Sequence, residues 1–206
     1  MNSTTQDPER LVGLARAGNT PALGELLELY RGYLLLLARV EVGHRLQRKL
    51  DPSDLVQETF LDAHRNFARF EGSTEAQFLA WLRRILASKT ANTVRHYLGT
   101  RGRDIRQELE DDLTQSFDQS ARRLQQLTTP SAASPSRHAM RREQSVMVAD
   151  ALQGLSEDYR EVLVLRHWED MTFPEIAERM DRSVDSVEKL WVRALARLRR
   201  SVGETT

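Results

Sequence analysis

The chain has 206 residues, 29% of them charged and 40% hydrophobic, and its 30 lysines and arginines balance 30 aspartates and glutamates. This length suits one large domain or two small ones, and the composition is that of a water-soluble protein with modest cores. The absence of cysteine excludes disulfides, thiolate metal sites and cysteine nucleophiles, and it fits a reducing cytoplasm.

The beginning of the chain is polar and lacks the apolar stretch of a signal peptide. The longest apolar run, from Tyr33 to Ala38, is far too short to cross a bilayer. We therefore expect a cytoplasmic protein without membrane insertion.

The charges are not evenly distributed, although they sum to zero. The stretch from Gln77 to Arg106 has seven basic residues and one acid, and the stretch from Lys189 to Arg200 has five basic residues and no acid. Between them, Gln107 to Asp118 has five acids and no base. Two basic blocks indicate two phosphate-facing surfaces, separated by a connector that is not one.

The first forty residues predict helices of a buried core. A short amphipathic helix from Arg10 to Ala17 is closed by Gly18. The next helix begins at Thr20, which can cap it, with Pro21 at the first helical position. The apolar residues of this helix recur at helical spacing and predict burial. They are Leu23, Leu26, Leu27, Tyr30, Leu34 and Leu37.

A strong helix start follows at Asp51, which can accept a capping hydrogen bond, with Pro52 at the first helical position. One side of this helix is apolar and faces a core. The opposite side presents Asp54, Gln57, Glu58, Leu61 and Arg65. An exposed leucine among carboxylates and amides is typical of a protein-docking surface. For the segment taken alone, an ordinary solvated face with one stray leucine is the favoured alternative.

A second long helix is predicted from Glu75 to Tyr97, with Ser73 or Thr74 as its cap. Its polar side is basic, and Trp81 and Tyr97 lie among the lysine and arginine residues. Stacking rings beside cations are what single-stranded nucleic acid requires. For Trp81, a place in the core is the favoured alternative.

Residues 99–139 form the predicted linker. It contains the acidic block, one short helix near Ala121–Leu127, and a tract rich in serine, threonine and proline from Thr128 to Ser136. Such composition favours a flexible or extended connector. The fold class is therefore all-α, with two small helical domains, residues 1–98 and 140–206, on a flexible linker.

The segment from Ser156 to Arg200 predicts a helix-turn-helix, winged-helix-like but without strands. Thr172 and Glu175 can form a capping box, and Ser183 can cap a long amphipathic helix. The first polar residues of that helix would point at base edges, and its later arginines would meet phosphates. The alternative is a helical hairpin with a solvated basic face.

Catalytic patterns are missing from the sequence. It contains no phosphate-binding loop, nucleophile elbow or paired-histidine metal motif, and its five histidines are scattered. We therefore expect neither an enzyme nor a cofactor or metal.

Three segments together resemble a bacterial sigma factor of the extracytoplasmic-function (ECF) group, in the sigma-70 family. The first, DPSDLVQETFLDAHRNFARFEG, is similar to the family's polymerase-binding helix. The second, FLAWLRRILASKTANTVRHY, is similar to the segment that melts the promoter and reads its −10 element. The third, LSEDYREVLVLRHWEDMTFPEIAERM with VEKLWVRALARLR, is similar to the domain that reads the −35 element.

The resemblance implies core RNA polymerase and promoter DNA as partners, and an anti-sigma factor or other regulator as a further one. The polymerase-binding residues would be Asp54, Gln57, Glu58 and Leu61. The −10 residues would be Trp81, Arg84, Lys89, Asn92 and Arg95, with the turn Phe70–Thr74 holding a flipped base. The −35 residues would be Ser183, Asp185, Ser186, Glu188, Lys189, Arg193 and Arg197. The acidic run Glu108–Asp112 would lie along the path of the RNA.

This chain departs from the family at three positions of the last segment. Asp181 stands where the family often has glycine, Glu188 where it commonly has lysine, and Leu190 where it is commonly basic. A stand-alone regulator, whose helix-turn-helix binds an operator without polymerase, is the alternative function.

Overall fold

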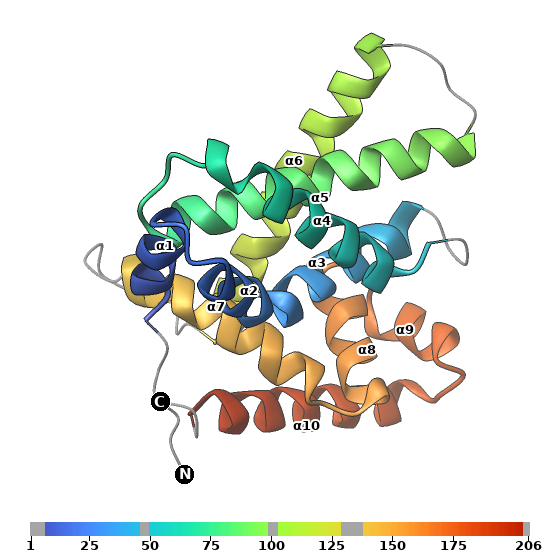
Figure 1. The fold of residues 1–206 in the computed structure, drawn as a ribbon. Helices are drawn as coiled ribbons and strands as arrows, with labels where there is room; N and C mark the ends of the chain where they lie inside the picture. Colours follow the sequence, from blue (N-terminus) through green and yellow to red (C-terminus); the bar gives the residue numbers. More distant parts are fainter. Residues whose placement is uncertain (1–6, 46–49, 99–102, 129–137, 204–206) are drawn as a thin grey trace. The chain divides into compact units, whose positions relative to one another are not determined.

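A computed structural model describes residues 7–45, 50–98, 103–128 and 138–203, and within these ranges the regular structure is helical throughout. The all-α prediction is confirmed. The elements are α1 (Pro8–Arg16), α2 (Thr20–Leu29), α3 (Arg31–Arg45), α4 (Pro52–Asn66), the 3₁₀ turn η1 (Phe67–Arg69), α5 (Glu75–Leu98), α6 (Arg103–Thr128), α7 (His138–Gln153), α8 (Glu157–His167), α9 (Phe173–Arg179) and α10 (Val184–Gly203) (Figure 1).

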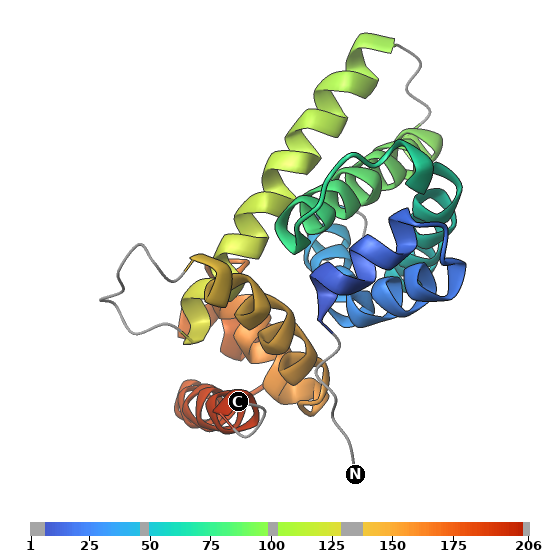
Figure 2. The ribbon, with the colours of Figure 1, turned by 60° about the vertical axis from the view of Figure 1, so that its left-hand side comes forward.

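The chain divides into two compact units, residues 1–118 and 119–206, and α6 contributes to both. In the first unit α4 packs against α3 on one side and α5 on the other, and α1 packs across α2 and α5. Figure 2 shows the same neighbours from a second direction. The two helices that carry the predicted polymerase and −10 residues therefore support each other.

The helix starts of the first unit follow the expected chemistry, with one shift. The Asp51 carboxylate accepts from the Ser53 backbone N–H at 2.8 Å and caps α4 as predicted. The cap of α2 is Asn19, whose side chain accepts from the Ala22 N–H at 3.0 Å, and not Thr20. The single long helix expected after Thr20 is instead two helices, α2 and α3, which meet at Tyr30. The Tyr30 ring is fully buried and packs on Phe78.

Aromatic rings form the centre of this unit. Phe67, Phe70, Phe78 and Trp81 contact one another at centroid separations of 5.1–6.3 Å, and Tyr30 joins them through Phe78. Ring pairs at such separations add about 0.5–1.5 kcal/mol each to the area they bury. The cluster lies under the start of α5, so it fixes the turn that precedes this helix.

The first half of the expected linker is not a loose connector. Residues 103–128 form the continuous helix α6, far longer than the short helix predicted near Ala121. Leu113, Phe117 and Leu124 are fully buried, at spacings of four and seven residues, so this acidic segment has a narrow apolar stripe that packs. Of the tract of serine, threonine and proline from Thr128 to Ser136, Thr128 is the last residue of α6 and the rest lies outside the described residues.

The second unit is built around α10, which packs against α7, α8 and α9. Val187, Ala194 and Leu198 form its buried side, as the periodicity predicted. The guanidinium of Arg123, from the end of α6, donates to the carbonyl oxygens of His167 and Trp168 at 2.9 Å each. These bonds satisfy carbonyl groups that the end of α8 leaves without helical partners.

Candidate protein- and DNA-binding surfaces

The outward face of α4 carries the four predicted polymerase-binding residues. Asp54, Gln57 and Glu58 are exposed, and the Leu61 side chain retains 51% of its accessible surface. The spacing of three, four and seven residues places these side chains along one side of the helix. The expectation of an exposed leucine among polar groups is therefore correct, and the surface is available to a partner.

Close packing and hydrogen bonds fix the turn from Phe70 to Thr74. A Cβ atom on Gly72 would lie 2.3 Å from the Phe70 ring, so the backbone approaches the ring as only glycine allows. Arg16 of α1 donates to the Gly72 carbonyl oxygen at 3.3 Å. The Gln77 side chain accepts from the Ser73 and Thr74 backbone N–H groups, while the Thr74 hydroxyl accepts from the Gln77 N–H.

A stripe along α5 contains four of the five predicted −10 residues. Trp81, Arg84, Asn92 and Arg95 recur at spacings that repeat each turn of a helix, and Arg84 and Asn92 are exposed. Trp81 is half-buried by its contacts with Phe67 and Phe70, so part of its ring packs in the core and part stays accessible. The Nε atom of Arg95 is buried without a hydrogen-bond partner.

The fifth residue, Lys89, lies off this stripe and faces α4. Its ammonium nitrogen is 2.9 Å from the Asp62 carboxylate, and both side chains are about a quarter to a third exposed (23% and 32%). The pair joins α4 to α5. A role for Lys89 at DNA stays a prediction, whereas its structural contact is established.

Arg83 does not belong to a phosphate-facing surface, contrary to what the count of basic residues suggested. Its side chain is only 16% exposed, and it donates to Asp118 at 2.6 Å and to the Tyr33 hydroxyl oxygen at 3.0 Å. Burial raises the pKa of the Tyr33 phenol, and the Arg83 charge opposes that rise. Arg83 therefore holds α3, α5 and α6 of the first unit together.

The helix-turn-helix has the predicted caps. Thr172 and Glu175 form the capping box of α9, in which the Glu175 carboxylate accepts from the Thr172 backbone N–H at 2.7 Å. The Thr172 hydroxyl also donates to this carboxylate, at 2.6 Å, and the two bonds, chiefly the one from the hydroxyl, lower the pKa of Glu175. The Ser183 hydroxyl accepts from the Ser186 N–H at 3.3 Å at the start of α10.

The turn between α9 and α10 accommodates the departure at Asp181. This residue takes a left-handed φ of 51°, the conformation that the family's glycine would favour. The Arg182 N–H donates to the Ala177 carbonyl oxygen at 2.9 Å, which closes α9 in the usual way for a left-handed cap. Asparagine and aspartate are the residues that replace glycine there at the lowest cost.

The predicted −35 residues lie on accessible parts of α10. Ser186 is half-buried, and the others are exposed: Ser183, Asp185, Glu188, Lys189, Arg193 and Arg197. Lys189 and Asp185 form an exposed ion pair at 2.7 Å, which DNA phosphates would have to disrupt to recruit the lysine. Sequence reasoning missed Val192, which is 57% exposed. Its spacing of four from Glu188 and three from Lys189 could have placed it on the same face.

His167, at the end of α8, is partly buried in the second unit. Its ring stacks on Trp191 at a centroid separation of 6.3 Å. Burial lowers the pKa of His167, and the neighbouring charges of Arg166 and Arg123 lower it further against the opposing effect of Asp170. We expect a neutral imidazole in the folded protein at neutral pH.

Among the described residues, no group of histidine, aspartate and glutamate side chains has the arrangement of a metal site. Within the same ranges, no helix combines the length and apolar character that a membrane crossing requires.

Comparisons with known proteins match both units. Residues 29–103 match the family model of sigma-70 region 2, and residues 145–198 match that of sigma-70 region 4. Together the matches cover more than half of the chain, and they include α4, α5, α9 and nearly all of the polar face of α10.

The relatives agree with these matches. The chain is 29% identical over 188 residues to an "ECF RNA polymerase sigma-E factor" of Haemophilus influenzae, covering 90% of each chain. It is also 29% identical over 194 residues to an "RNA polymerase sigma-H factor" of Pseudomonas aeruginosa, covering 93% of this chain and 91% of that one. Among solved structures, the RsbN–BldN complex aligns at 21% identity and a TM-score of 0.31, covering 92% of this chain and 97% of that one. The two family matches and the sequence relatives show that the chain belongs to the sigma-70 family of RNA polymerase sigma factors, in its extracytoplasmic-function group.

Proposed function

We propose that this sigma factor binds core RNA polymerase through the exposed face of α4. The observation that carries the proposal is the position of Leu61, half exposed among Asp54, Gln57 and Glu58. An apolar side chain with a polar rim has the composition of a small docking site, in which the leucine is the anchor.

The stripe on α5 would meet the −10 element. Arg84 and Asn92 are accessible for phosphate and base contacts. Trp81 is partly accessible and packs on Phe70, the first residue of the turn that contains Gly72. Opening about ten base pairs costs on the order of 14 kcal/mol. Stacking one flipped base returns only about 1–3 kcal/mol. The protein would therefore select and nucleate the opening while polymerase holds the bubble, and the free protein would bind promoters weakly.

The start of α10 would read the −35 element in the major groove. Ser183, Asp185, Ser186, Glu188 and Lys189 would approach base edges, while Arg193 and Arg197 would contact the backbone. Glu188 is suited to accept a hydrogen bond from the amino group of cytosine. An acid at this position predicts a −35 sequence different from that read by relatives with lysine there.

An anti-sigma factor or another regulator stays a predicted partner, and no catalytic role is proposed for the chain. The stand-alone regulator is not favoured by the family matches, because both family regions are present in order.

Polymerase binding tests the proposal. Leu61→Ser should weaken the binding of the full chain to core polymerase at least tenfold. The matched control is Leu14→Ser on α1, which changes another exposed leucine (39%) and should leave binding unchanged. Equal binding by both variants and the unmodified chain would remove α4 from the interface. Tight, specific DNA binding without polymerase would then favour the stand-alone regulator.

A further inference from the structure

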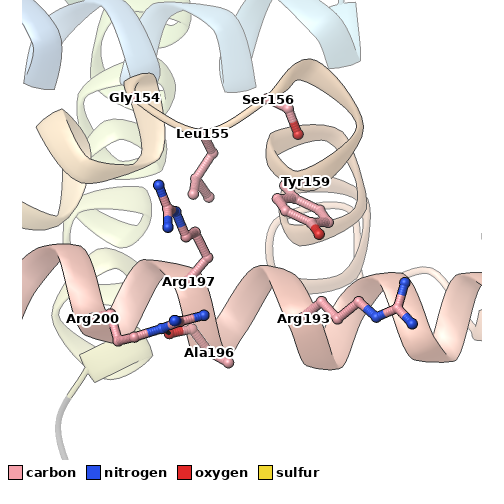
Figure 3. A pocket seen from close by; sticks show the side chains of 8 residues that line it. All are labelled: Gly154, Leu155, Ser156, Tyr159, Arg193, Ala196, Arg197 and Arg200. Atoms are coloured by element: carbon pink, nitrogen blue, oxygen red, sulfur yellow. Dashed lines mark hydrogen bonds between the residues drawn. The ribbon is translucent and has the colours of Figure 1, made fainter.

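The arginines of α10 lie on the side of Ser186, seven residues before Arg193, and are turned away from Asp185 and Glu188. Arg193, Arg197 and Arg200 are spaced by four and three residues, so they lie along one side of the helix. One residue advances the helix by about 100°, which turns Arg193 well away from Val192 and the line of Asp185. Figure 3 shows the hollow between α10 and the turn that leads from α7 into α8, with Arg197 and Arg200 close together at one end and the Arg193 side chain extending away from them at the other.

The hollow has a volume of about 580 Å³, within the range of small-ligand sites. Besides the three arginines, Ser156 and Tyr159 contribute hydroxyl groups to its wall, and Leu155 contributes an apolar side chain. All of these residues belong to the second unit.

Three guanidinium groups make the lining of the hollow positively charged. No carboxylate is among its lining residues. In the part of the chain that the structure describes, Arg193 and Arg197 form no ion pair, and the Nε–H of Arg200 donates only to the Ala196 carbonyl oxygen of its own helix. The nearby acid Asp158 is engaged by Arg182 at 2.5 Å. Three like charges within two helical turns repel one another unless an anion lies between them.

The donors also match one kind of anion. A guanidinium group presents a planar fork of N–H donors that fits two phosphate oxygens, and hydroxyl groups can supply further donors to the same oxygens. The Ser156 hydroxyl makes no capping hydrogen bond within α8, so it is available for this purpose.

We propose that this hollow binds a phosphate group, held by Arg193, Arg197 and Arg200 with the hydroxyl groups of Ser156 and Tyr159. The phosphate can come from the DNA backbone beside the −35 element or from a free phosphorylated compound. The first source rests on the proposed function, whereas the second does not.

The experiment uses the full chain and a triple variant, Arg193→Gln, Arg197→Gln and Arg200→Gln. The control is Arg199→Gln, an exposed arginine of the same helix outside the hollow. Circular dichroism should show equal helix content for all three proteins.

In the first arm, each protein is titrated with pyrophosphate, and a titration with chloride to the same ionic strength serves as the control. NMR follows the backbone amide signals of Gly154, Ser156 and Tyr159. The unmodified chain and the control should show saturable shifts, and the triple variant should bind at least tenfold more weakly.

The second arm measures the salt dependence of holoenzyme binding to a promoter recovered by run-off transcription. Each neutralised phosphate contributes about 0.9 to the slope of log K against log salt concentration. Three arginines that share one phosphate predict a slope lowered by about one in the triple variant. Three separate backbone contacts predict a change of about three.

Saturable pyrophosphate shifts that the triple variant loses support a phosphate site in the hollow. A decrease of about one in the slope of log K against log salt concentration assigns the DNA backbone as a source of the phosphate. The inference is overturned if pyrophosphate gives no saturable shift and the slope either stays constant or changes by about three. Failure of the holoenzyme to bind any promoter would contradict the proposed function, and the pyrophosphate arm would still decide the hollow.

Discussion

The Lys89 ammonium nitrogen lies 2.9 Å from the Asp62 carboxylate and joins the helix that carries the polymerase face to the helix that carries the −10 stripe. Both side chains are partly buried, so the pair should stabilise the first unit modestly. A double-mutant cycle of Lys89→Ala and Asp62→Ala, followed by urea unfolding, should give a coupling free energy of about 0.5–1 kcal/mol. A coupling near zero would show that the pair does not stabilise the fold.

Arg84, unlike Lys89, is exposed and lies on the −10 stripe, so its replacement should affect promoter opening and not stability. Arg84→Ala should lower open-complex formation by holoenzyme about tenfold, as measured by permanganate reactivity of unpaired thymines. Its urea midpoint should match that of the unmodified chain. Unchanged opening would remove Arg84 from the −10 surface.

Gly72 has no room for a side chain. Its added Cβ would lie 2.3 and 2.6 Å from two Phe70 ring atoms and 2.9 Å from the Gln77 Cβ. Gly72→Ala should therefore destabilise the protein by about 1–3 kcal/mol, the usual cost of overpacking. Gly24→Ala in α2, where no atom lies within 4 Å of the added Cβ, should be neutral or stabilise by up to about 1 kcal/mol. Equal effects of the two variants on urea unfolding would contradict the close approach at Gly72.

The Arg83 guanidinium needs the Asp118 carboxylate as its counter-charge. Asp118→Ala leaves a mostly buried cation with only the Tyr33 hydroxyl as partner, and Asp118 itself is 43% exposed, so solvent compensates in part. We expect a loss of about 1–2 kcal/mol in urea unfolding. Arg83→Lys should also destabilise, because one ammonium group cannot reproduce both contacts of the guanidinium fork. A lysine variant as stable as the original would show that charge alone suffices.

The stability of the second unit should depend on pH through His167. Its folded-state pKa is lowered, chiefly by burial, whereas the unfolded chain takes up the proton near pH 6.5. At this residue the unfolded state therefore binds more protons below pH 6.5, and the contribution of His167 to stability falls as pH decreases from there through its folded-state pKa. Burial raises the pKa of Asp150 to about 6, and that residue contributes in the opposite direction. His167→Gln should reduce this decline in the melting temperature, while His64→Gln on exposed α4 should not. An identical decline in the His167 variant would assign the pH dependence to other groups.

Much of this arrangement could be predicted from local patterns. The caps at Asp51, Thr172 and Ser183 follow from side-chain chemistry within three residues, and the exposure of Leu61 follows from helical spacing on an otherwise polar face. Such features depend on neighbours along the chain, which the sequence displays directly.

Apart from the cap of α2, which is Asn19 and not the neighbouring Thr20, the main errors depended on contacts between distant residues. From the sequence, Arg83 is interpreted as a basic surface residue. Its partner Asp118 lies 35 residues away along the chain, so only the folded structure reveals the contact. The acidic segment from residue 107 to 118 suggested a connector because its composition is polar, whereas burial of Leu113 and Phe117 makes it part of a packed helix. The apolar spacing runs from Leu23 through Tyr30 to Leu37, so it does not show that α2 ends before Tyr30.

Run-off transcription tests the central claim most directly. Purified core polymerase would be given sheared DNA of the source organism with the unmodified chain, with Leu61→Ser, or with the control Leu14→Ser. We expect discrete transcripts with the unmodified chain and the control, and their loss with Leu61→Ser. Transcripts of equal strength with Leu61→Ser would contradict the assignment of α4. The absence of any transcript, together with tight DNA binding by the protein alone, would contradict the polymerase-dependent function itself.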